Sequence, residues 1–226
     1  MQKANFLLLL LVGVAPCAMA QSFSSGSTGA DGALSCSLVA DACPCPAVQL
    51  PASGILNYTT VNVGPSCYLS FSPNVTNTPV TMLATGAVTI AGRVWVGYPT
   101  SSYLTAPGPG GFYGGAPGQN GVGPGGGITG KTDGTQNGKW VGPLGLVPII
   151  GGSGGAGFSI PGGGGGGAIV IASSTSITVT GSIDASGGAF SNAGYGANGA
   201  IRLVSNSISR SREVRASRRR PVSTAY

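Results

Sequence analysis

The chain has no histidine and little charge of either sign. Charged residues make up 7% of its 226 residues, five of them are acidic, and Glu213 is the single glutamate. Without imidazoles, and with few carboxylates, the chain lacks most of the side chains that serve general acid–base catalysis and transition-metal binding. The sequence therefore predicts a protein that is not an enzyme, with no catalytic residue, no metal site and no cofactor.

Basic residues are also scarce outside the C-terminal end. The net charge is +6, but the basic and acidic side chains of residues 21–207 cancel one another: Lys131, Lys139, Arg93 and Arg202 against Asp31, Asp41, Asp133 and Asp184. The excess lies in residues 208–226, and we expect residues 218–226, RRRPVSTAY, to be a disordered basic tail. Because the body is neutral, the sequence predicts no nucleic-acid partner.

No apolar run is long enough to form a transmembrane anchor. Residues 6–14 are apolar, but a spanning helix needs about 20 such residues. The run follows Lys3 and precedes Ala18-Met19-Ala20, the arrangement of a secretory signal peptide. We therefore predict that residues 1–20 are removed and that the protein is secreted or lies at the cell surface. A lipoprotein signal fits less well because a proline precedes the cysteine of the leader.

Four cysteines remain after such a cleavage: Cys36, Cys43, Cys45 and Cys67. An even number of cysteines in an oxidising compartment predicts disulfides, and the spacing leaves three connectivities open. The Cys43-Pro44-Cys45 sequence holds two sulfurs apart on a stiff backbone, so each is expected to reach a distant partner, for example Cys36 and Cys67. A zinc site is disfavoured because the chain has neither a CxxC pair nor a histidine.

Two segments, 88–94 and 177–183, share the apolar spacing Φ-x-Φ-x-x-x-Φ with a glycine in the same gap. A weaker copy follows in residues 200–217. Short strands that recur with glycine bends are typical of a β-solenoid. We therefore expect an all-β chain forming a short right-handed parallel β-helix with glycine-rich insertions. Its predicted inward side chains are Val80, Met82, Val88, Ile90, Val94, Ile169, Ile171, Ile177, Val179, Ile183, Ile201 and Leu203.

Glycine is concentrated in one part of the chain. Residues 97–167 hold 28 of the 42 glycines without a strict Gly-X-Y repeat, which excludes collagen. We interpret this stretch as an insertion between coils, partly ordered through extended backbone. The predicted organisation is a signal peptide (1–20), an N-terminal cap with cysteines (21–53), first solenoid coils (54–96), the glycine-rich insertion (97–167), later coils (168–217) and the tail (218–226).

Several motifs imitate binding sites by chance. Residues 125–132 match the phosphate-loop spelling GxxxxGK[ST], and residues 152–157 match GxGxxG. Both sites require a helix after the glycines, and neither sequence predicts one. Thr89, Thr178 and Thr180 suggest a threonine row of the ice-binding kind, but the row is interrupted at Ala91, and threonine suits any solvated strand.

Six stretches carry a resemblance: STGADGA, LPASGILNYTTVNV, NTPVTMLATGAVTIAG, PIIGGSGGAG, GGGGGGAIVIAS and GAIRLVSNSIS. Together they resemble a group of exported bacterial glycine-rich repeat proteins of unassigned function. The resemblance covers most of residues 22–209 and implies export and a parallel β-helix of the adhesin-like kind, with no catalytic residues to transfer. The chain departs from the group at residues 93–98, which are bulky, in its cysteine-rich cap, and after Ile208.

Three functional hypotheses follow. We expect a non-enzymatic secreted or surface-associated structural or adhesin-like protein, whose neutral polar surface meets extracellular glycans or a matrix. A carbohydrate-active β-helix enzyme is the alternative, and it requires acidic residues such as Asp133 and Asp184 to converge. A truncated or frameshifted fragment of a longer β-helix protein is the third, because Arg210 occupies a position that is apolar in the other copies. The ligand and the oligomeric state stay open.

Overall fold

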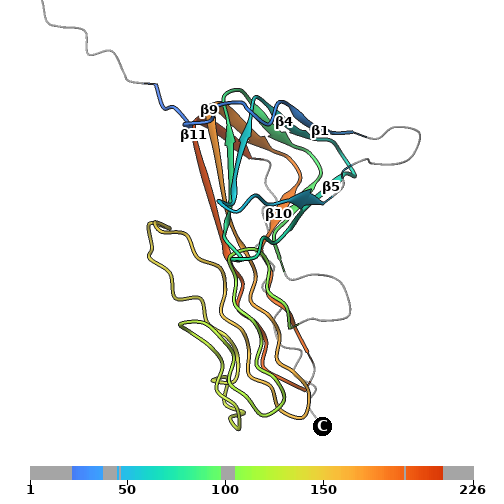
Figure 1. Cartoon of the computed structure of the whole chain (residues 1–226), viewed down its shortest axis with the longest axis vertical. Coiled ribbons are helices and arrows are strands. Elements are labelled where there is room, and N and C mark those ends of the chain that lie inside the picture. Colours follow the sequence, from blue (N-terminus) through green and yellow to red (C-terminus); the bar gives the residue numbers. More distant parts are fainter. Residues whose placement is uncertain (1–21, 38–44, 46, 98–104, 191, 211–226) are drawn as a thin grey trace, which may run out of the picture.

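The computed structural model describes residues 22–37, 45, 47–97, 105–190 and 192–210; the predicted signal peptide, Cys43 and the predicted basic tail lie outside these residues. Strands gather at one end of the long axis, and long runs without strands form the other end (Figure 1). The described residues contain eleven strands and no helix: β1 (Leu34–Cys36), β2 (Val48–Gln49), β3 (Ile55–Tyr58), β4 (Val61–Val63), β5 (Tyr68–Ser72), β6 (Val80–Ala84), β7 (Val88–Ile90), β8 (Arg93–Trp95), β9 (Ala168–Val179), β10 (Ser182–Asp184) and β11 (Ala200–Arg210).

The strands form two parallel sheets. The larger has the order β1-β4-β7-β9-β6-β3, with β11 also paired to β9, and the smaller has the order β10-β8-β5-β2. The 12-residue strand β9 is long enough to pair with β6 through its first half and with β7 through its second half. Since β11 pairs along both halves of β9, the strand β9 holds the larger sheet together.

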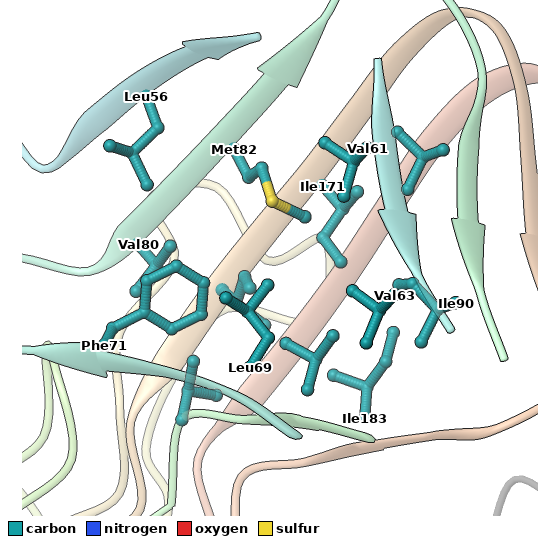
Figure 2. Close-up of a cluster of buried hydrophobic side chains, with 14 of the residues drawn as sticks. Leu56, Val61, Val63, Leu69, Phe71, Val80, Met82, Ile90, Ile171 and Ile183 are labelled. Carbon is teal, nitrogen blue, oxygen red and sulfur yellow. The ribbon is translucent and has the colours of Figure 1, made fainter. Parts of the chain in front are cut away.

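Alternating apolar residues place the core between the two sheets. Figure 2 shows Val80, Met82 and Ile171 of the larger sheet facing Leu69 and Ile183 of the smaller one. Ten of the twelve predicted inward side chains are buried, which confirms their facing, and each contributes about 1.5–3 kcal/mol. The other two, Ile201 and Leu203, are half-buried because they belong to β11, which pairs only with β9 among the described strands.

The predicted alignment of the repeats is confirmed in the strand pairing. Val88 of β7 pairs with Ile177 of β9, and Ile177 pairs with Ile208 of β11. Arg210, which is charged where the other copies are apolar, also lies in register, because it pairs with Val179. The apolar spacing therefore predicts correctly which residues of separate segments lie beside one another.

The prediction of an all-β chain forming a short right-handed parallel β-helix is wrong. The strands make a nearly closed parallel sheet and a smaller parallel sheet, not a stack of equivalent coils. Parallel pairing throughout is the arrangement of α/β folds, although no helix covers these sheets in the described residues. The error has a physical cause: alternation determines which side chains face inward, but it does not determine the path of the chain between strands. Here the path from β8 to β9 runs through the glycine-rich residues.

These glycine-rich residues form a second packed unit, the glycine bundle, which comprises residues 105–167, 185–190 and 192–199. Its central run, residues 151–157, hydrogen-bonds to neighbours in three directions. Gly152 and Gly155 donate to the run 162–167, and Gly154 and Gly157 donate to the run 119–122. The third direction is served by residue 156, whose N–H donates to Gln136 and whose carbonyl accepts from Gly194. A period of three residues with no bonds inside the run is that of a polyproline II helix.

Glycine is required in the bundle because the backbones are in contact. A Cβ added at Gly165 would lie 1.8 Å from the carbonyl oxygen of Gly152, and one added at Gly154 would lie 1.9 Å from that of Tyr113. Both distances are shorter than any real Cβ contact. At these positions the runs therefore pack at a separation that only glycine permits, as in the collagen triple helix.

Residues 22–36 run across the larger sheet and tie its strands together. The Phe23 N–H donates to Asn206 of β11, the Ser25 hydroxyl donates to the carbonyl of Ala84, and the Ser27 hydroxyl donates to that of Tyr58. A disulfide joins Cys36 to Cys45, which confirms the prediction of disulfides for this pair, and Cys67 is also disulfide-bonded.

Candidate functional site

The outer face of the smaller sheet carries a group of large polar and aromatic side chains. Leu69 of β5, Val94 of β8 and Ile183 of β10 pair in register and point into the core. Because side chains alternate along a strand, the residues on either side of them point outward. These are Tyr68, Arg93 and Ser182 in one row and Ser70, Trp95 and Asp184 in the next.

Four of these residues form what we call the Arg93 cluster: Tyr68, Arg93, Trp95 and Asp184. The Arg93 Nη2 lies 2.7 Å from the Asp184 Oδ2. Its Cζ lies 4.3 Å from the centre of the Trp95 ring and 5.9 Å from that of Tyr68. The two ring centres are 6.3 Å apart and tilted by 35°. The guanidinium therefore bonds to a carboxylate while lying over two aromatic rings.

Hydrogen bonds fix the orientation of the carboxylate. One Asp184 oxygen bonds to Arg93, and the other, Oδ1, accepts the N–H of Ser186 at 2.8 Å. The side chain of Asp184 is 21% exposed and that of Arg93 is 44% exposed. An ion pair this open to water contributes at most about 1 kcal/mol to the free energy of unfolding.

Burial raises the pKa of the Tyr68 phenol; the guanidinium of Arg93 lowers that pKa, and the nearby carboxylate of Asp184 raises it further. The phenol is therefore protonated at neutral pH and can both donate and accept a hydrogen bond.

Two hollows border the cluster. The first, of about 470 Å³, is lined by Ser66, Cys67, Tyr68, Gly92, Arg93, Thr180, Gly181 and Ser182. The second, of about 290 Å³, is lined by Tyr68, Ser70, Phe71, Ser72, Pro73, Trp95, Gly97, Pro107, Gly108 and Pro109. Since Tyr68 lines both, the hollows meet at the cluster. The second lies where the smaller sheet joins the glycine bundle.

Asp133 and Asp184, the acidic pair that the enzyme hypothesis requires, have different partners and lie in different parts of the fold. Asp184 pairs with Arg93 on β10. Asp133 belongs to a turn of the glycine bundle, where hydrogen bonds from the Thr135 side chain and backbone hold the pKa of its carboxyl below the ordinary value. Within the described residues, no three His, Cys, Asp or Glu side chains gather in a way that could hold a metal ion.

The two sequence motifs that match nucleotide-binding loops, residues 125–132 and 152–157, lie in the glycine bundle. Gly127 donates a hydrogen bond to Gly154, and Ile128 donates one to Thr135. The backbone of residues 125–132 therefore bonds to other runs of the bundle. No helix follows either spelling within the residues that the structure describes. Gly125, Gly126 and Gly127 pack against neighbouring backbone, whereas a Cβ added at Gly130 would meet nothing within 4 Å.

The sequence alone does not single out the Arg93 cluster. It marks residues 93–98 only as bulkier than the similar glycine-rich proteins. A signal is nevertheless present: Val94 and Ile183 are predicted to face inward, so Arg93, Trp95 and Asp184 have to face outward together. The position of Tyr68 could not be predicted from the sequence, because β5 carries no copy of the repeat and its pairing with β8 does not follow from the spacing.

Comparisons with models of known protein families, with curated proteins and with solved structures found no match. A search of the described residues for a helix long and apolar enough to cross a membrane also found none.

Proposed function

We propose that this protein is non-enzymatic, is exported to the medium or the cell surface, and binds extracellular glycans in an adhesin-like or structural role through the Arg93 cluster. Its export and its kinship with exported bacterial glycine-rich proteins are parts of this proposal. The predicted signal peptide supports export, and so does the Cys36–Cys45 disulfide, since disulfides persist in oxidising compartments.

One observation carries the proposal: an ion pair lies against the exposed ring of Tyr68 and the half-buried ring of Trp95 on an otherwise neutral sheet face. An aromatic ring offers a sugar ring a flat apolar surface, while fixed polar groups orient its hydroxyls. Arg93 supplies donors, Asp184 supplies acceptors, and Tyr68 supplies both. A ligand rich in hydroxyl groups matches all three.

The proposal is tested by screening the folded chain, residues 21–226, on an array of bacterial, plant and animal glycans. We expect binding that falls at least about tenfold in Trp95→Ala, equivalent to about 1.4 kcal/mol. The matched control is Tyr113→Ala, which removes an exposed aromatic ring from the glycine bundle and leaves binding unchanged.

Thermal melting of each variant separates lost binding from lost folding. Failure of the folded chain to bind any glycan would contradict the proposal. So would binding that survives both Trp95→Ala and Tyr68→Ala. Release of shortened sugars from a bound polysaccharide would show an enzyme instead.

A further inference from the structure

We infer that the glycan bound at the Arg93 cluster is a neutral, linear chain of several sugars lying along β5, and not a single terminal sugar. This inference rests on the proposed glycan binding and adds to it the length and charge of the ligand. It follows from the extent of the hollows, from the balance of charge at their junction and from the hydrogen-bonding groups that line them.

The two hollows extend beyond both ends of strand β5. The first hollow begins at Ser66, the second ends at Pro73, and Tyr68 joins them. Strand β5, which joins the two hollows, spans about 13 Å from Tyr68 to Ser72, at roughly 3.3 Å per residue. A single sugar at the cluster would leave both ends of this surface empty.

The charge of the site is balanced. Arg93 is the basic residue of the cluster, and Asp184 lies 2.7 Å from it. Neither hollow is lined by any further charged residue among those the structure describes. A polyanionic glycan would bring its negative charges close to the Asp184 carboxylate with Arg93 as the sole positive charge among the described residues that line the hollows, whereas hydroxyl groups can bond to the pair as it stands.

The remaining polar groups are hydroxyls spread along the whole length. Ser66, Thr180 and Ser182 line the first hollow, and Ser70 and Ser72 line the second. Hydroxyls donate and accept, so they suit a ligand that repeats the same groups along its chain. Proline-rich peptides also bind aromatic grooves, but their prolines bring no N–H to the Asp184 carboxylate.

The test is a chain-length series with neutral linear oligosaccharides of glucose, xylose and N-acetylglucosamine, from monosaccharide to hexasaccharide, measured by calorimetry on the full chain. We expect at least one series to gain about tenfold or more in affinity between the disaccharide and the tetrasaccharide. Two filling variants, Ser182→Trp in the first hollow and Ser72→Trp in the second, should each reduce that gain by a larger factor than they reduce disaccharide affinity. Melting curves verify that both variants fold.

The outcomes separate the two proposals. Equal affinity at every chain length, or length dependence that neither filling variant alters, overturns the extended site and leaves glycan binding in place. Tighter binding of a sulfated or uronic-acid chain overturns the neutral class. Failure of every sugar to bind overturns the proposed function itself, as does binding of a proline-rich peptide in place of all sugars.

Discussion

The two ends of this molecule exclude water in opposite ways. In the sheets, aliphatic side chains such as Met82 and Ile171 fill the space between backbones. In the glycine bundle, every residue from 151 to 157 is buried, and the largest side chains among them are those of Ser153 and Ala156. There the backbones themselves fill the space. A sequence made mostly of glycine can thus form a packed unit when its central run hydrogen-bonds to neighbouring runs on three sides.

The comparison predicts different sensitivities at the two ends. A sheet tolerates changes on its outer face and fails when a charge enters the core. The bundle has no core of large side chains to disturb, and it fails when any atom is added between backbones.

The largest effect is expected from a charge in the sheet core. Ile177→Asp places a carboxylate where the side chain is 0% exposed and has no partner, which should cost more than about 4 kcal/mol and abolish folding. Thr178→Asp, one residue along on the outer side of β9, should fold normally. Equal loss of protease resistance in both variants would contradict the assigned facing.

A single methyl group should nearly match that effect in the bundle. Gly165→Ala puts a Cβ 1.8 Å from a backbone oxygen, and overpacking against rigid backbone costs about 3 kcal/mol or more. Gly145→Ala is the control because a Cβ there meets nothing within 4 Å. Denaturant unfolding should show a large loss for the first and almost none for the second. A bundle that accepts alanine at both positions is not packed as described.

A smaller effect is expected at the bend of β9, where pairing passes from β6 to β7. The buried Ser173 hydroxyl donates to Gly86 at 2.8 Å and accepts the N–H groups of Thr175 and Ser176. Ser173→Ala leaves these groups without their partner, at a cost of about 1–3 kcal/mol. Ser176→Ala should change the free energy of unfolding by less than about 0.5 kcal/mol. Equal stability of both variants would mean that the bend does not depend on this hydroxyl.

The smallest effect concerns pH. Burial raises the pKa of the Tyr58 phenol, and the Asp31 carboxylate raises it further. A group whose pKa is raised on folding stabilises the protein below its unfolded pKa, and that stabilisation is lost as pH rises through the folded value. The chain should therefore lose stability above about pH 10, the ordinary value for tyrosine, and Tyr58→Phe should lose less. Identical alkaline melting curves would contradict this assignment.

The sheets are partly predictable from sequence because side-chain alternation is a local signal. The repeat spacing makes Val88, Ile177 and Ile208 equivalent positions, and the strand pairing confirms that they lie side by side. The overall topology is not predictable in this way, since alternation says nothing of the connection between β8 and β9. The Arg93 cluster escapes prediction because its four residues come from three strands whose order in the smaller sheet depends on that topology.

The bundle is harder to predict for a different physical reason. A polyproline II run needs only glycine where backbones touch, and residues 151–157 and 162–167 share no pattern beyond glycine itself. The partners of each run are set by contacts between segments far apart in the chain, such as Gly157 with Gln119 and Gly194 with Ala156. Such contacts leave no periodic trace in the sequence.

The most direct test of this account is amide hydrogen exchange followed by NMR across both ends of the molecule. The N–H groups of Gly152, Gly155, Gly163 and Gly166 all donate to neighbouring runs, and we expect them to be protected nearly as strongly as those of β9. Exchange of these four amides at the rate of an unfolded chain, while β9 stays protected, would contradict the existence of a second packed unit.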